Sequence, residues 1–128
     1  MMTREEVILA YACGHRDFSN LDLSNLDLSM VNLSGAYLYK TDLYNTNLYK
    51  ANLSNANISK ADARMTNLRE TELFWVKAHE TNLYKATMSG GSADGFIMSY
   101  ILNNYNKDNY PTIDEVIKTL GIIYEKTN

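Results

Sequence analysis

Apolar side chains recur every five residues between Arg16 and Gly95, and no polar residue interrupts the series. The series consists of Phe18, Leu23, Leu28, Leu33, Leu38, Leu43, Leu48, Leu53, Ile58, Ala63, Leu68, Leu73, Ala78, Leu83, Met88 and Ala93. Most members directly follow Asp or Asn, and small or apolar residues dominate two positions before each member. A helix repeats every 3.6 residues and a strand every two, so neither would bury all of these side chains. The pattern predicts a chain that turns one corner per repeat and winds into a β-solenoid, in which each unit contacts only its neighbours.

Three repeats carry a family resemblance: Ala51–Asn55, Ala56–Lys60 and Thr81–Lys85 look like the A(D/N)LXX unit of pentapeptide repeat proteins. The resemblance spans residues 16–95 and implies a right-handed quadrilateral β-helix with four repeats per coil. It therefore implies about four coils for this all-β solenoid. We expect one compact domain, with an N-terminal helical cap at 1–15, the β-helix at 16–95, and a C-terminal helical cap or tail at 96–128.

Both ends of a solenoid need covering, because they expose strand edges and core side chains. At the N-terminus, Thr3 and Glu6 have the spacing of a capping box, and Gly14 suits the end of a helix. The first fifteen residues are therefore predicted to cap the solenoid with a helix.

Glycines interrupt the repeat near residues 90–95, and the apolar run 96–102 predicts a helix over the last coil, with Asp94 as its N-cap. Thr112 and Glu115 form a second capping box, and Gly121 is expected to end that helix. These segments are interpreted as a cap. In some pentapeptide repeat proteins a C-terminal helical segment joins two solenoids, so a homodimer through this segment is the alternative.

The charge balance narrows the choice of partner. Twelve basic and fifteen acidic side chains give a net charge of −3, which argues against direct binding to nucleic acid or to an anionic membrane. The single cysteine excludes an intramolecular disulfide. Neither a signal peptide nor a membrane-spanning segment is recognisable, so we expect a cytoplasmic protein.

Residues twenty apart should stack on one face of a four-sided coil, and one such column holds Asp22, Asp42 and Asp62. Neighbouring carboxylates repel and raise one another's pKa, so this acidic column could bind a cation or imitate a row of phosphates. The favoured interpretation is structural: Asp and Asn at turns accept hydrogen bonds from the nearby backbone.

The position after each central residue changes from Ser to Tyr to Arg along the chain. In columns, this places Arg64 between Tyr44 and Tyr84 on one face and Arg69 beside Tyr49 on the next. An exposed cation–π pair contributes about 0.5–1 kcal/mol, so the columns could simply stabilise the stack. Tyr and Arg are also typical of interface hot spots, and we place a candidate binding surface here.

Phe74 and Trp75 form a second candidate surface, because both occupy outward positions of one repeat. A cap or a partner is expected to cover the only tryptophan of the chain.

No catalytic or cofactor chemistry is expected. His15 and His79 lie far apart, Cys13 has no second thiol, and no Ser–His–acid arrangement is recognisable. The sequence thus predicts no catalytic residue, no cofactor and no metal site.

The leading functional hypothesis is a non-enzymatic interaction module for an unidentified protein partner. One alternative, drawn from the resemblance, is a DNA mimic that binds DNA gyrase or topoisomerase IV, to inhibit it or protect it from quinolones. Another is nucleic-acid binding through the Tyr/Arg ladder. Residues 16–95 argue against the DNA mimic, because eight basic side chains nearly balance nine acidic ones.

Overall fold

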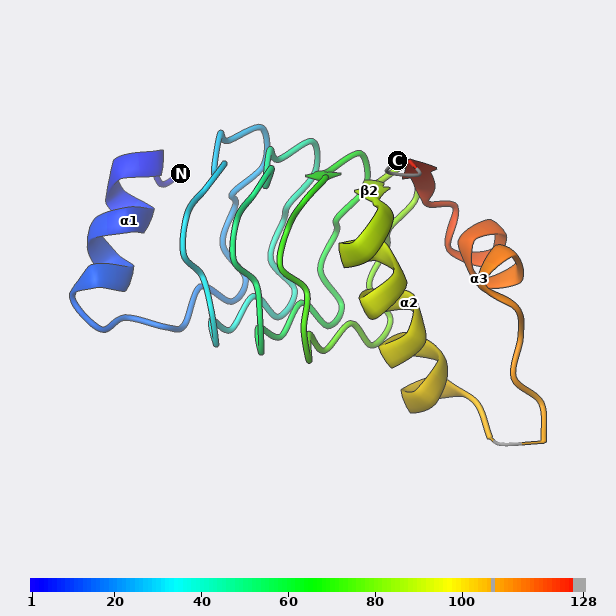
Figure 1. Cartoon of the computed structure of the whole chain (residues 1–128). Coiled ribbons are helices and arrows are strands. Elements are labelled where there is room, and N and C mark those ends of the chain that lie inside the picture. Colours follow the sequence, from blue (N-terminus) through cyan, green and yellow to red (C-terminus); the bar gives the residue numbers. More distant parts are fainter. Residues whose placement is uncertain (107, 126–128) are drawn as a thin grey trace.

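The computed structural model describes residues 1–106 and 108–125. Helix α1 (Arg4–Ala12) comes first, and a long segment of short parallel pairings follows it. Figure 1 shows this segment as a stack of turns, with α1 at one end and the C-terminal helices at the other.

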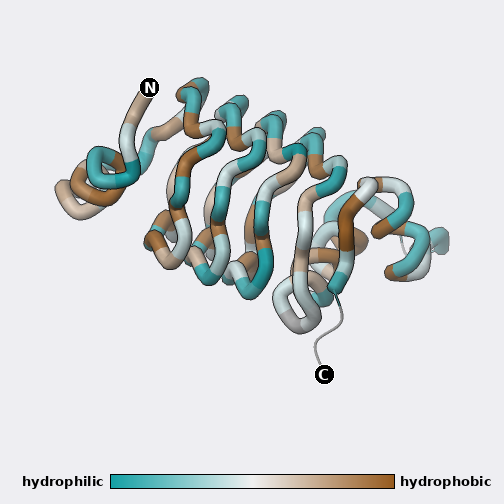
Figure 2. The backbone as a smooth tube through the Cα atoms, turned by 90° about the horizontal axis from the view of Figure 1, so that it is seen from above, coloured by the Kyte–Doolittle hydropathy of each residue, from teal (hydrophilic) through white to brown (hydrophobic). Residues whose placement is uncertain are grey.

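The central segment is a β-solenoid in which residues twenty apart pair in parallel. Asp22 pairs with Asp42 and Asp42 with Asp62, and the same offset of twenty recurs in the other isolated pairs. The Leu23 N–H donates to the Asp42 carbonyl at 2.9 Å, and the Asp42 N–H donates to the Leu21 carbonyl at 2.9 Å. One turn of the solenoid therefore takes twenty residues, or four repeats. Figure 2 shows hydrophilic and hydrophobic stretches recurring at matching places in successive turns.

Each repeat turns its corner through a residue in the left-handed region. At Lys40, φ is 57°, and the Thr41 N–H donates to the Leu38 carbonyl across the corner at 3.1 Å. This geometry is a type II turn, which requires a positive φ at its third residue. Gly35 adopts the same conformation, with φ 71°, and glycine does so without steric cost.

The side chains inside the stack form one apolar core, and nearly every predicted central residue from Phe18 to Met88 is buried. Four buried threonines two positions before the centre bond to the previous turn: Thr41, Thr46, Thr71 and Thr81. The Thr41 hydroxyl donates to the Phe18 carbonyl at 2.8 Å, and the Thr71 hydroxyl donates to the Leu48 carbonyl at 2.7 Å. Among the described residues, every buried side-chain nitrogen and oxygen has a partner. The threonines thus bury polar groups without an unpaired donor.

The predicted N-terminal helix and its capping box are confirmed. Thr3 caps α1, with reciprocal hydrogen bonds to Glu6, and Gly14 follows the helix at φ 94°. Val7 of this helix is fully buried in the solenoid core. The Tyr11 hydroxyl donates to the Ser34 carbonyl at 2.8 Å. The helix is therefore anchored to the first turn by one apolar and one polar contact.

The C-terminal boundary differs from the prediction. Strand β2 (Thr87–Ser89) pairs with strand β1 (Asn67–Leu68), and α2 (Gly90–Asn104) begins directly after it. The helix thus starts within the segment assigned to the repeats, and its N-cap is Ser89 rather than Asp94. The reason is packing: Ala93, Ile97 and Ile101 have helical spacing, and all three are buried. Ala93 is accordingly a helix residue and not the centre of a sixteenth repeat.

The end of the described chain returns to the solenoid. Helix α3 (Ile113–Leu120) has the predicted Thr112–Glu115 capping box, and Gly121 ends it at φ 68°. Strand β3 (Ile123–Glu125) then pairs in parallel with β2, so the tail adds a strand to the stack. A side chain at position 121 would meet the Tyr84 ring at 2.7 Å. The left-handed φ favours glycine there, and the close approach of the Tyr84 ring requires it.

No helix in the described ranges is long and apolar enough to span a bilayer.

Candidate functional site

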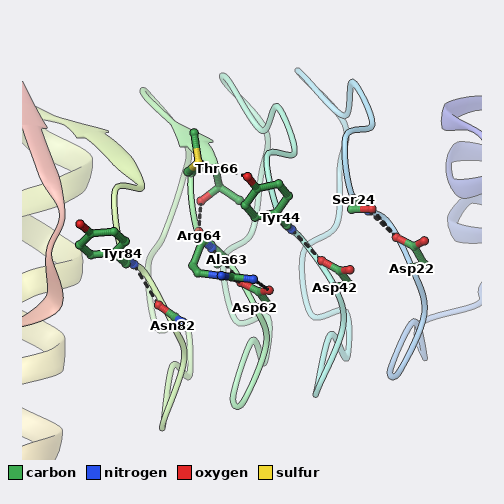
Figure 3. Close-up of polar contacts among 11 residues, drawn as sticks. Asp22, Ser24, Asp42, Tyr44, Asp62, Ala63, Arg64, Thr66, Asn82 and Tyr84 are labelled. Carbon is green, nitrogen blue, oxygen red and sulfur yellow. Dashed lines mark hydrogen bonds and ion pairs between the residues drawn. The ribbon is translucent and has the colours of Figure 1, made fainter.

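The predicted acidic column exists, and its carboxylates are engaged locally (Figure 3). Oδ1 of Asp22 accepts the Ser24 backbone N–H at 3.0 Å, and Asp42 accepts the Tyr44 N–H at 3.0 Å. Asp62 accepts the Arg64 N–H at 3.2 Å. These bonds favour the structural interpretation, in which the carboxylates hold the corners of the turns.

The pKa values of this column do not follow the expectation from carboxylate repulsion. Hydrogen bonds from Ser24 lower the pKa of Asp22, and the Arg64 side chain lowers the pKa of Asp62. The prediction of raised values is therefore wrong for these two groups, because the hydrogen bonds from Ser24 and Arg64 favour the ionised carboxylates.

The Tyr44–Arg64–Tyr84 column lies beside these carboxylates (Figure 3). The Arg64 guanidinium donates to both Asp62 oxygens, at 2.8 and 2.7 Å, and its central carbon lies 5.2 Å from the centre of the Tyr44 ring. Tyr84 is 55% exposed. The predicted Arg–aromatic stacking thus forms between Arg64 and Tyr44. The arginine is held in one orientation from two sides.

The second pair, Tyr49 and Arg69, is arranged differently from the prediction. Arg69 forms a bidentate ion pair with Glu125 of β3, at 2.8 and 2.7 Å, and this contact lowers the pKa of Glu125. The cation near the Tyr49 ring is Lys50, at 5.4 Å. Arg69 therefore fastens the C-terminal strand to the solenoid.

Phe74 and Trp75 are exposed at a corner of the solenoid, at 67% and 74%. Together with one side of α2 they line a groove of about 260 Å³. Its other lining residues are Gly95, Met98, Ser99, Leu102 and Asn103. The described part of the chain therefore leaves the Trp75 ring largely uncovered.

Sequence reasoning missed the contribution of α2 to this groove. Met98 and Leu102 are one turn apart on the helix, and they are 48% and 62% exposed. Ile97 and Ile101 are buried, so α2 has a second apolar stripe beside the one that packs on the solenoid. The spacing of these residues already indicates an apolar stripe on the helix. The sequence could not tell whether this stripe faces the solenoid or the solvent before the position of α2 was known.

A second cavity of about 310 Å³ lies between the last turn and α2, with Lys77, His79, Phe96 and Tyr100 among its lining residues. Within the described ranges, no group of three His, Cys, Asp or Glu side chains could hold a metal ion.

The repeat and its twenty-residue register correspond to a known family. Residues 17–55 and 51–90 match the family model Pentapeptide repeats (8 copies). The chain belongs to the pentapeptide repeat family. The two matches together span more than half of the chain, as the resemblance of the repeats predicted.

Similar solved structures are also pentapeptide repeat proteins. One, from the thylakoid lumen of Arabidopsis thaliana, is 26% identical over 59% of this chain and 55% of that chain, with a TM-score of 0.34. One from the cyanobacterium Cyanothece 51142 is 31% identical over 51% and 48%, with a TM-score of 0.37. A third, from Nostoc PCC 7120, is 22% identical over 96% of both chains, with a TM-score of 0.36.

This chain spans about half the length of the first two structures. No curated protein matches it.

Proposed function

We propose that this pentapeptide repeat protein is a non-enzymatic interaction module that presents a rigid β-helical surface to a protein partner. The proposal includes the finer geometry that the resemblance implies: a right-handed quadrilateral β-helix of about four coils with helical caps. The twenty-residue register of parallel pairs supports this geometry.

The Tyr44–Arg64–Tyr84 column is the observation that carries the proposal. Tyr and Arg are enriched among the residues that contribute most to protein–protein binding. Arg64 is already oriented by Asp62 and by the Tyr44 ring, so binding would cost little side-chain entropy. A preorganised Arg beside the Tyr44 ring, with the exposed Tyr84 in the same column, suits the centre of an interface.

The DNA mimic is less well supported by the acidic column. Arg64 neutralises Asp62 within hydrogen-bonding distance, so the column presents no continuous negative face. The basic and acidic side chains of residues 16–95 also nearly cancel. A mimic of the phosphate backbone needs the opposite: uncompensated carboxylates in a row.

Affinity capture from the native host tests the proposal. The bait is the full chain, compared with Arg64→Ala, Tyr84→Ala and the control Lys50→Ala, which removes an exposed cation near the Tyr49 ring on the neighbouring column. We expect a protein that the wild type and the control capture equally and that Arg64→Ala and Tyr84→Ala lose at least tenfold. The proposal fails if every captured protein is retained by both variants.

A supercoiling assay with DNA gyrase separates the DNA mimic from the module. The mimic predicts that the wild type competes with DNA and that Asp42→Asn with Asp62→Asn abolishes this competition. The module predicts that the wild type leaves supercoiling unchanged.

A further inference from the structure

Ala78 stands where the other turns of the solenoid carry a large side chain. Residues twenty apart occupy equivalent positions, and the earlier members of this column are Phe18, Leu38 and Ile58, all of them buried. Ala78 itself is only partly buried. The last turn therefore has too little side chain at this point to fill the space beside α2.

A small central residue does not by itself leave a cavity. Ala63 is also a central residue, and it is buried because the fourth turn stacks on it. The turn that contains Ala78 is followed by α2 instead of another repeat (Figure 1). The cavity of about 310 Å³ lies between this turn and the helix. Its volume falls in the range of ligand pockets, roughly 300–1,000 Å³.

The cavity has an apolar inner wall and a polar rim. Val76 and Phe96 are buried, and the ring centre of Phe96 lies 6.1 Å from that of Tyr100, with the planes tilted by 35°. A planar aromatic group packs well against such a wall, because aromatic rings prefer offset or edge-to-face contacts. The polar lining residues are Ser59, Lys77, His79, Asn103 and Asn104.

The charges on the rim are basic. Lys77 and His79 line the cavity, and none of its described lining residues is acidic. Glu80 lies outside the lining, with its carboxylate oxygens 3.7 Å from Lys60 Nζ and 3.9 Å from His79 Nε2. Within the described part of the chain, Lys77 forms no ion pair. The rim therefore offers a cation to an anionic group, and such charge-assisted hydrogen bonds are strong.

Neutral donors stand beside this cation. The Ser59 hydroxyl accepts the His79 backbone N–H at 3.2 Å and can donate its own proton to a further acceptor. Asn103 contributes an exposed amide from α2. A carboxylate or phosphate at the rim would thus meet one charged donor and two neutral ones.

We propose that this cavity binds a small aromatic anion, whose ring occupies the space beside Ala78 and whose carboxylate or phosphate lies at Lys77. The inference goes beyond the proposed function, because an interaction module needs no ligand site. It uses no residue of the Tyr44–Arg64–Tyr84 column, so the two proposals can fail separately.

The probes are benzoate, phenyl phosphate and benzylamine, which share one phenyl ring and differ in the charged group. Saturation-transfer NMR with the full chain measures their binding. We expect each anion to bind at least tenfold more tightly than benzylamine, and the tighter anion identifies the head group as carboxylate or phosphate. Inorganic phosphate, which lacks the ring, should bind at least tenfold more weakly than phenyl phosphate. Nuclear Overhauser effects should connect the bound ring to the Val76 methyl groups.

Three variants locate the site. Ala78→Leu restores the large side chain that the column carries elsewhere, so it should fill the cavity and weaken binding of both anions at least tenfold without lowering the melting temperature. Lys77→Ala should weaken binding of both anions at least fivefold and leave benzylamine unaffected. The control Lys85→Ala removes an exposed cation of the same turn, near the Tyr84 ring, and should bind like the wild type.

The proposal is overturned if neither anion binds, if benzylamine binds as tightly as benzoate, or if Lys77→Ala binds both anions like the wild type. Retained binding in a folded Ala78→Leu variant would overturn it as well, because the compounds would then lie elsewhere. Lys77→Ala decides the question even if Ala78→Leu unfolds, since Lys77 is exposed and its removal leaves the core intact.

Discussion

Each repeat places a central residue inside the solenoid and the next residue outside, and the two positions differ in how much they vary. In the third turn Ala63 is buried and Arg64 is exposed, although they are neighbours in the chain. The inward positions stay apolar along the stack, while the outward ones change from Ser24 to Tyr44 to Arg64 on a single face. The inner position is constrained by the width of the core. The outer one is free to carry recognition.

The energetics of the two positions support this division. Burying a Leu side chain stabilises a protein by about 1.5–3 kcal/mol, whereas an exposed ion pair contributes about 0–1 kcal/mol. Substitutions inside the stack should therefore reduce stability, and substitutions outside should change binding. The predictions below test this difference, beginning with the largest effect.

Leu48→Ala should lower the free energy of unfolding by about 2–5 kcal/mol, because it leaves a cavity in the middle of the solenoid. Chemical denaturation followed by far-UV circular dichroism measures the loss. Tyr49→Ala, at the outward position of the same repeat, is the matched control and should cost less. Equal losses at both positions would contradict the division between inside and outside.

Thr71→Val should lower the free energy of unfolding by about 0.5–1.5 kcal/mol. The substitution keeps the side-chain shape but removes the hydroxyl that donates to the Leu48 carbonyl of the previous turn. The same denaturation experiment applies. A more stable Thr71→Val variant would show that the bond between turns contributes nothing.

The effect of Asp62→Asn should depend on pH and should be the smallest of the three. The pKa of Asp62 is lowered from its ordinary value of 3.8 by Arg64, so its ionised form is favoured in the folded protein. The stabilisation is therefore present above that ordinary pKa and is lost as the pH falls through the lower folded value. The difference in stability between wild type and variant should shrink toward zero as the solution is acidified. A difference that grows on acidification would contradict this account.

The repeated parts of the fold were predictable because the period locates the central residues and the resemblance to pentapeptide repeat proteins implies four repeats per coil, which together set the register. Once Leu23 and Leu43 occupy equivalent positions, Asp22 and Asp42 must stack, and the stacking of Arg64 on Tyr44 follows. The two capping boxes were predictable because they depend only on residues three apart.

The parts outside the repeat were not predictable in the same way. The partner of Arg69 is Glu125, which follows two helices and a connecting segment, and no local pattern sets where β3 pairs. The start of α2 at Gly90 was missed because glycine disfavours helix interiors, by about 1 kcal/mol relative to alanine. Burial of Phe96, Ile97 and Ile101 against the last turn overrides this preference. The exposure of Trp75 depends on where α2 lies, so the sequence could not decide between a cap and a partner.

The most direct test of the division between core and surface is the free energy of unfolding of one variant that combines Arg64→Ala, Phe74→Ala and Trp75→Ala. These three outward side chains are exposed and contribute an ion pair, a cation–π contact and part of a groove wall. Far-UV circular dichroism must follow the unfolding, because the variant contains no tryptophan. We predict a loss of no more than about 1.5 kcal/mol, as expected for exposed pairs. A loss as large as that of Leu48→Ala would show that the outward columns hold the solenoid together and would contradict the account.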